Sequence, residues 1–204
     1  MTKTFVQVAR VLHATKAEGP GLRSAVWFQG CSIRCSGCIN PHLFTTKGGT
    51  AVDVDEVIQG ALEAGSEGLT FLGGEPFDQA GAAASLAAAA HRLGLGVITF
   101  SGYRYEDLRI RDDDSRRLLA DTDLLVDGPY LAGSAETNRS LVGSTNQRFL
   151  HLTDRYADFD PVEQPNHVDV RVGPDGAIEL AGFLGSDGLK DFASIAGAVR
   201  RRRA

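Results

Sequence analysis

All three cysteines of the 204-residue sequence fall in one short segment, as Cys31, Cys35 and Cys38 in the spacing Cx3CxxC. Thiolates are soft ligands that suit iron–sulfur clusters and zinc. An odd, tightly clustered set of cysteines makes a poor disulfide framework, so metal binding is the better interpretation. On a cubane 4Fe–4S cluster, three thiolates would leave one iron without a protein ligand, and that iron could bind a cofactor or substrate.

A zinc site is the alternative for this segment. His42 follows shortly after Cys38, so ligation of zinc by three cysteines and one histidine is conceivable. The cysteine segment alone therefore leaves both zinc and an iron–sulfur cluster open.

A second segment with chemical potential is Gly73-Gly74-Glu75-Pro76, which follows an apolar stretch. The carboxylate of Glu75 can accept a charge-assisted hydrogen bond from a bound amino group. Gly73 and Gly74 allow the backbone to come close to a ligand, and Pro76 cannot continue a strand. Taken alone, the segment also fits an ordinary turn between a strand and a helix.

The elements that must position these residues alternate between strands and helices. Apolar patterns predict strands at 4–12, 22–29, 68–72, 95–100 and 124–126, and helices at 53–64, 79–93, 105–108 and 114–119. This alternation implies a mainly parallel α/β sheet, in which active sites lie at the carboxyl ends of the strands. The cysteine segment, the Gly-Gly-Glu-Pro turn, residues 101–103 and residues 127–128 all follow predicted strand ends.

The pattern changes after about residue 150. Alternating residues at 168–172 and 177–183, with Gly-Pro-Asp-Gly between them, predict a β-hairpin. Residues 187–203 have the pattern of a terminal helix. We therefore expect a core domain at 1–150 and a C-terminal extension at 151–204.

The motifs together resemble the radical S-adenosylmethionine (SAM) enzymes. Cx3CxxC is the signature spacing of that superfamily, and a glycine at position 37 is typical of its activase branch, which includes the activating proteins of anaerobic, class III ribonucleotide reductase. The resemblance covers roughly residues 5–150. It rests on Gly19-Pro20-Gly21-Leu22-Arg23, Phe28-Gln29-Gly30-Cys31, Cys35-Ser36-Gly37-Cys38-Ile39-Asn40-Pro41, Gly73-Gly74-Glu75-Pro76, Ser101-Gly102-Tyr103, residues 125–130 and residues 143–148.

The resemblance implies a partial, open β/α barrel with the hairpin and helix as an extension, and it implies a 4Fe–4S cluster and SAM as cofactors. The cluster ligands would be Cys31, Cys35 and Cys38. The SAM-binding residues would be Gly73, Gly74, Glu75, Pro76, Ser101 and Asp127. Ser101 would contact a ribose hydroxyl and Asp127 would contact polar groups of SAM or a nearby cation. No catalytic residue beyond these ligands is expected.

Four further polar positions belong to this expectation. Asn146 and Gln147 would contact SAM or the partner. Arg23 and Arg34 flank the cysteine segment, where they could stabilise negative charge, although solvated or paired surface charges are the simpler interpretation.

The function implied is that of an activase. It would cleave SAM reductively to a 5′-deoxyadenosyl radical and generate a glycyl radical on a partner enzyme, such as anaerobic ribonucleoside-triphosphate reductase. The electron would come from a flavodoxin- or ferredoxin-type reductant. Two alternatives stay open: a radical SAM enzyme that acts on a peptide or small molecule, as 7-carboxy-7-deazaguanine synthase does, and a zinc-stabilised interaction module. Residues 151–204 have no counterpart in the family pattern.

Bulk properties exclude some other classes. The net charge of −5 argues against a general nucleic-acid binder, which would usually be basic. No apolar run approaches the roughly 18 residues that a membrane-spanning helix needs, and residues 1–5 lack the apolar stretch of a signal peptide. We therefore expect a cytoplasmic protein with no nucleic-acid or membrane partner.

Overall fold

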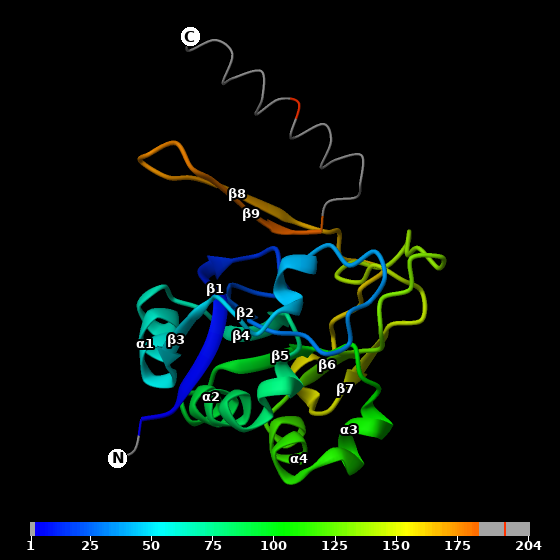
Figure 1. Ribbon diagram of the computed structural model, residues 1–204, viewed down its shortest axis with the longest axis horizontal. Coiled ribbons are helices and arrows are strands. Elements are labelled where there is room, and N and C mark those ends of the chain that lie inside the picture. Colours follow the sequence, from blue (N-terminus) through cyan, green and yellow to red (C-terminus); the bar gives the residue numbers. More distant parts are fainter. Residues whose placement is uncertain (1–2, 184–193, 195–204) are drawn as a thin grey trace.

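The computed structural model describes residues 3–183 and residue 194. This part of the chain forms a seven-stranded sheet with four α-helices on one side and a two-stranded hairpin on the other (Figure 1). The helix predicted at 187–203 lies outside the described residues, apart from position 194. No helix in the described ranges is long and apolar enough to span a membrane.

The sheet has a parallel centre and antiparallel edges, in the order β3-β1-β2-β4-β5-β6-β7. Its central strands pair in parallel, and they are β2 (Arg23–Phe28), β4 (Gly68–Gly73), β5 (Gly96–Phe100) and β6 (Leu124–Asp127). The antiparallel strands are β1 (Phe5–Thr15), β3 (Thr50–Asp53) and β7 (Arg148–His151). The predicted α/β class is confirmed, but the sheet is mixed. The sequence did not predict β3 and β7, because Thr-Ala-Val-Asp and Arg-Phe-Leu-His lack the continuous apolar run that identified the equally short β6.

The four helices cover one face of the sheet (Figure 1). They are α1 (Val54–Glu63), α2 (Ala80–Arg92), α3 (Tyr105–Arg111) and α4 (Asp113–Ala120). Asp53 caps α1 by accepting a hydrogen bond from the Asp55 N–H at 3.1 Å. The small side chains of Ala83, Ala87 and Ala90 are fully buried, so α2 packs closely between the sheet and its neighbouring helices.

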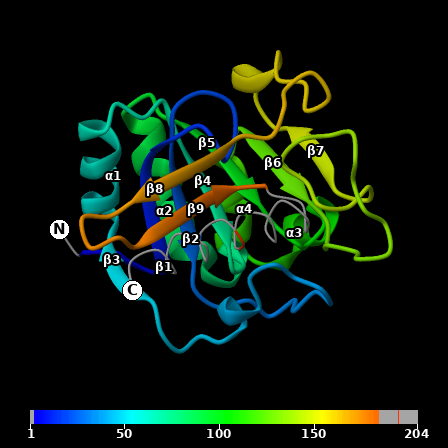
Figure 2. The same ribbon diagram turned by 90° about the horizontal axis from the view of Figure 1, so that it is seen from above.

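Alternation along β2 separates two apolar clusters. Val26 and Phe28 pack in the cluster beneath the helices, whereas Ala25 and Trp27 pack in a smaller cluster on the opposite face. That opposite face is crossed by the antiparallel hairpin of β8 (Val168–Val172) and β9 (Ile178–Gly182), as Figures 1 and 2 show. The predicted hairpin is therefore present. Three short 3-10 helices complete the described elements: η1 (Pro41–Phe44), η2 (Pro76–Gln79) and η3 (Asp154–Tyr156).

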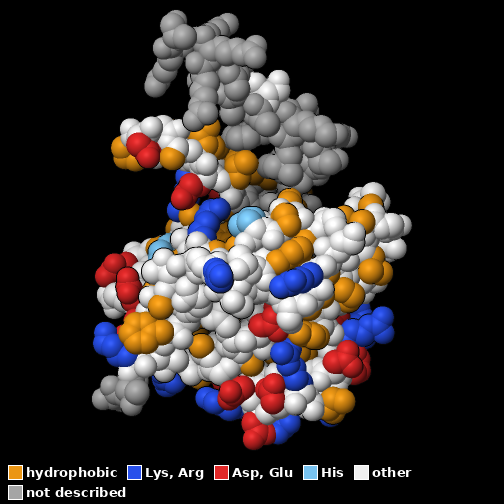
Figure 3. All heavy atoms as spheres, viewed as in Figure 1, with side chains coloured by type: hydrophobic (Ala, Val, Ile, Leu, Met, Phe, Trp, Pro, Cys, Tyr) orange, Lys and Arg blue, Asp and Glu red, His pale blue; other side chains and the backbone are white. Residues whose placement is uncertain are grey.

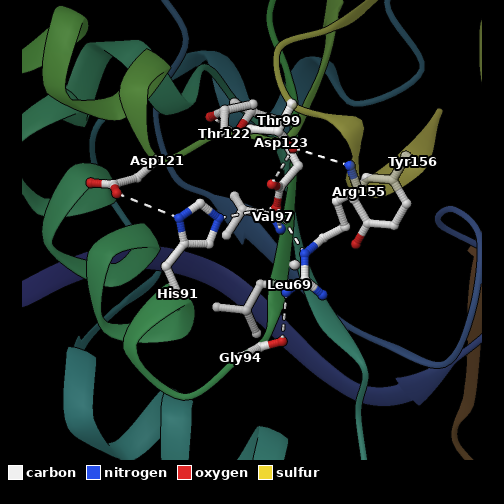
Figure 4. A network of polar contacts seen from close by, with 12 residues as sticks. Leu69, His91, Gly94, Val97, Thr99, Asp121, Thr122, Asp123, Arg155 and Tyr156 are labelled. Atoms are coloured by element: carbon white, nitrogen blue, oxygen red, sulfur yellow. Dashed lines mark hydrogen bonds and ion pairs between the residues drawn. The ribbon is translucent and has the colours of Figure 1, made fainter.

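Asp123 directly precedes β6, and its buried carboxylate connects several elements at the amino-end edge of the parallel strands (Figure 4). Asp123 accepts hydrogen bonds from the Val97 N–H at 2.8 Å and the Thr153 hydroxyl at 2.6 Å, and the His91 ring lies 3.0 Å away. Burial alone would raise the pKa of Asp123, but these hydrogen bonds lower it below its ordinary value. The network fixes α2, β5 and the chain after β7 to one point.

Arg23 was expected to be a solvated or paired surface charge. This expectation is wrong, since the side chain is fully buried at the amino end of β2. Its guanidinium donates to the hydroxyls of Thr70 at 2.5 Å and Tyr156 at 2.7 Å, and to the carbonyl of Leu69. A buried guanidinium needs such partners, and they come from strands whose placement a local pattern does not reveal. Arg34 is exposed, as expected.

Candidate functional site

A single cavity lies at the carboxyl ends of the parallel strands and collects most of the predicted site residues. Each of the four central strands contributes a segment to its wall. The wall includes Cys31, Cys35 and Cys38 after β2, Gly73, Gly74 and Glu75 at the end of β4, Ser101 and Gly102 after β5, and Gly128 after β6. Pro76 and Asp127 are not part of the wall.

The turn after β4 is hydrogen-bonded to the chain that leads into the cysteines. The Gly74 N–H donates to the Phe28 carbonyl at 2.9 Å, and the Glu75 N–H donates to the Gly30 carbonyl at 2.8 Å. A Cβ at Gly74 would lie 2.1 Å from the Gly30 carbonyl oxygen, which no real side chain tolerates. Gly73 has a φ of +97°, and a Cβ there would meet the backbone of Trp27 at 2.7 Å. The glycines therefore allow this turn to dock on β2, and their approach to a bound ligand stays a prediction.

The three cysteines are free thiols that border the same space and are partly exposed. Burial raises the pKa of the Cys31 thiol, while hydrogen bonds from the Arg34 and Ile33 N–H groups act in the opposite direction. Gly30 and Gly37, with φ of +94° and +77°, let the loop turn back on itself.

This donor set fits an iron–sulfur cluster better than a single ion. In the described part of the chain, no three His, Cys, Asp or Glu side chains are grouped closely enough to hold one metal ion. His42, the fourth ligand of the zinc alternative, lines a neighbouring cavity and not the cavity of the cysteines. Three thiols around a shared space are the arrangement that a cluster with one open iron needs.

Glu75 is the buried charge of the site. Only 1% of its surface is exposed, and its carboxylate accepts hydrogen bonds from the Phe77 N–H at 3.0 Å, the Ser101 hydroxyl at 2.9 Å and the Gly102 N–H at 2.9 Å. Burial raises the pKa of Glu75 to about 7, although these hydrogen bonds oppose the shift. Ser101 thus holds Glu75 in place, and its predicted contact with a ribose stays a prediction.

Two predicted SAM contacts lie behind the cavity wall. Asp127 is fully buried and accepts hydrogen bonds from the Tyr105 N–H at 2.7 Å and Arg148 Nε at 2.8 Å. Asp127 therefore ties β6 to β7 and to the start of α3, while Pro76 is buried as the first residue of η2. Contact of either residue with SAM stays a prediction.

The two late polar residues are used to shape the loop after β6. Gln147 lines the cavity, and its side-chain oxygen accepts the N–H groups of Gly143 at 2.9 Å and Ser144 at 3.1 Å. Asn146 donates to the Pro129 carbonyl at 2.7 Å. Both residues thus order the segment that closes one side of the cavity.

Sequence reasoning missed Asp78, which connects three parts of the site. Its carboxylate accepts the Ser32 N–H at 2.7 Å and the Ser32 hydroxyl at 2.9 Å, next to Cys31. It also accepts from the Tyr103 hydroxyl and from Arg111, each at 3.3 Å. The acidic residue in the first turn of η2 is visible in the sequence, but its partners come from distant loops.

Comparison with known proteins places this geometry in a family. The family model described as a 4Fe-4S single cluster domain matches residues 17–150, which include every predicted site residue. The anaerobic ribonucleoside-triphosphate reductase-activating protein of Enterobacteria phage T4 is 26% identical over 153 residues, covering 71% of this chain and 94% of that protein. The pyruvate formate-lyase 1-activating enzyme of Escherichia coli K12 is 30% identical over 149 residues, covering 69% of this chain and 58% of that enzyme.

Other matches are shorter. The pyruvate formate-lyase-activating enzyme of Clostridium pasteurianum is 39% identical over 64 residues, or 28% of this chain. This chain spans 27% of that enzyme, and 34% of the corresponding enzyme of Listeria monocytogenes.

We predict that Asp78→Ala lowers the iron content of the anaerobically reconstituted protein, because the loop that carries Cys31 loses its anchor at Ser32. Asp78→Asn keeps one acceptor oxygen and should retain most of the iron. Iron analysis, together with circular dichroism to confirm folding, measures both variants against Asp107→Ala, an exposed acid on α3. Equal iron content in all three proteins would contradict the anchoring role.

Proposed function

Because the chain belongs to the 4Fe-4S single cluster domain family, we propose that it is a radical SAM activase that generates a glycyl radical on a partner enzyme. The observation that carries this proposal is the convergence of three free thiols and the buried Glu75 on one cavity at the carboxyl ends of parallel strands.

The residues that line the cavity would have three different roles. Cys31, Cys35 and Cys38 would hold a 4Fe–4S cluster. When bound, this cluster and SAM supply the electron transfer that splits SAM into methionine and a 5′-deoxyadenosyl radical. Glu75 would accept a hydrogen bond from the amino group of SAM, and Ser101 and the Gly102 N–H hold its carboxylate in position for that bond. The apolar part of the wall excludes water from the reaction, and it comprises Ile33, Phe44, Leu72, Phe100 and Phe183.

The proposed partner is an anaerobic ribonucleoside-triphosphate reductase. The share of each relative that this chain matches supports this choice. The match spans 94% of the T4 reductase-activating protein but only 58% and 27% of two pyruvate formate-lyase activators. The hydrogen atom would come from the α-carbon of a glycine in the partner and end in 5′-deoxyadenosine. A flavodoxin- or ferredoxin-type protein would supply the electron.

Two statements about architecture belong to the same proposal. The open mixed sheet would be the partial barrel of a radical SAM core formed by residues 1–150. Residues 151–204, which begin beyond the family match, would be an extension that adapts the core to its substrate.

Glu75→Gln should keep the cluster but weaken SAM binding. The substitution preserves an acceptor oxygen yet removes the charge, and a hydrogen bond to a charged group contributes about 1.5–3 kcal/mol.

Because the pKa of Glu75 is raised to about 7, the carboxyl is neutral below that pH. SAM affinity of the parent protein should therefore fall between pH 8 and pH 6 by more than the affinity of the variant does.

Anaerobic titration with SAM measures both effects, and Glu56→Gln on the exposed face of α1 is the matched control. An unchanged SAM affinity in Glu75→Gln would remove this carboxylate from the cofactor site.

The partner is tested by following one hydrogen atom. A reductase with deuterium at the α-carbon of its target glycine is mixed with the reduced protein and SAM. We expect a protein radical by electron paramagnetic resonance and deuterium in the 5′-deoxyadenosine, because the hydrogen is abstracted directly. Cys35→Ala should give neither signal. If the label never moves and a peptide or small molecule is modified instead, the activase function is wrong while radical SAM chemistry survives.

A further inference from the structure

A second cavity lies beneath the hairpin, on the face of the sheet opposite the helices. Its volume is about 530 Å³, and it is larger than the cavity of the cysteines, at about 180 Å³. Arg10 of β1 and Trp27 of β2 line its floor, and residues 180–183 at the end of the hairpin line its roof. Figure 3 shows the hairpin above the body of the molecule, with acidic, basic and His side chains where the two meet.

The two cavities share a wall. Asn40, Leu72 and Phe183 border both of them. A molecule that occupied the cavity beneath the hairpin would therefore lie next to the proposed site of SAM cleavage.

The guanidinium of Arg10 lies on the floor of this cavity and contacts the hairpin. A register shift between Val8 and Arg10 breaks the alternation of β1 and sets Arg10 opposite Trp27. The guanidinium lies 4.6 Å from the centre of the Trp27 ring, and Arg10 Nη1 donates to the Leu180 carbonyl at 2.7 Å. These two contacts hold the guanidinium in place between Trp27 and the hairpin.

The other edge of this guanidinium is buried and unused. Arg10 Nε and Nη2 have no hydrogen-bond partner among the described residues. These two nitrogens form the fork that binds a carboxylate through two parallel hydrogen bonds. Buried N–H groups without a hydrogen-bond partner are unfavourable, so two such groups on one edge of a guanidinium that lines a cavity indicate a site for a ligand.

A buried carboxyl on the same cavity, that of Glu18, makes no hydrogen bond with Arg10. Glu18 has 3% of its surface exposed, and it accepts the Gly182 N–H at 2.7 Å through Oε1. Its Oε2 is buried and has no partner in the described part of the chain. Burial raises the pKa of Glu18 to about 7, with Gly182 and Arg10 opposing the shift and Asp169 adding to it. At neutral pH much of Glu18 is therefore protonated, which leaves the cavity able to accept an anion.

We propose that the cavity beneath the hairpin is a subsite for a substrate carboxylate, which Arg10 binds through Nε and Nη2. The inference deepens the proposed function, because a substrate anchored there would extend across the shared wall toward the cysteines. The carboxylate can come from an acidic side chain of a peptide segment of the partner or from a free carboxylic acid. The roof lies beyond residues 17–150, so the extension covers a subsite whose binding group is on β1.

Trp27 provides the readout, since it is the only tryptophan of the chain and lies against Arg10. The reconstituted protein with SAM is titrated with N-acetyl-Gly-Gly-Glu amide, with its glutamine counterpart and with glutarate, and Trp fluorescence is recorded. The glutamate peptide should bind about tenfold or more tightly than the glutamine peptide. Glutarate binding as tightly as the glutamate peptide would identify a free acid as the source, and weaker binding would identify a peptide.

Variants at position 10 distinguish two parallel hydrogen bonds from Arg10 from the effect of a positive charge alone. Arg10→Gln should abolish the preference for the acid, and Arg10→Lys should lose most of it because a lysine offers no fork. Glu18→Gln should retain the preference. Equal affinity for the two peptides, absence of binding to all three probes, or a preference that survives in Arg10→Gln would overturn the inference.

The test is independent of radical transfer. Binding of the acid probes without any glycyl radical on the reductase would support the subsite and refute the activase function. Radical transfer to the reductase without a preference for the acid probes would refute the subsite alone.

Discussion

The site depends on how closely the turn after β4 packs against the end of β2. The two strands pair in parallel register from Arg23 with Gly68 to Phe28 with Gly73, so both end at the same level. Gly74 then lies against the Gly30 carbonyl, and two hydrogen bonds join the turn to the chain that enters the cysteine loop. This contact brings the thiols and Glu75 to one cavity. A side chain at position 74 would separate them.

The sequence predicted which segments meet but not everything that holds them. The strand ends, the cysteine loop and the Gly-Gly-Glu-Pro turn were predictable because the carboxyl ends of parallel strands share one edge of a sheet. Asp78 and Arg23 were not, because their partners belong to distant segments that no local pattern connects. The register shift that redirects Arg10 is equally invisible in a pattern of apolar residues. The comparisons confirm the resemblance to radical SAM activases that the motifs indicated.

The two faces of the sheet have different tasks. Alanine-rich packing and the Asp123 network make the helical face a rigid support. The face beneath the hairpin keeps polar groups without partners among the described residues, and its cavity adjoins that of the cysteines. Each cavity also contains a buried carboxyl whose pKa burial raises to about 7, Glu75 in one and Glu18 in the other. Chemistry and substrate selection would thus occupy neighbouring cavities built on the same strands.

The most direct test of the central contact is a comparison of Gly74→Ala with Gly133→Ala, a glycine whose added Cβ would meet nothing within 4 Å. Both proteins are reconstituted anaerobically, and iron content and reductive SAM cleavage are measured on the folded fraction. If the contact between Gly74 and Gly30 assembles the site, Gly74→Ala loses SAM cleavage and most of its iron, while Gly133→Ala behaves as the parent. Parent-like iron content and cleavage in Gly74→Ala would contradict the account.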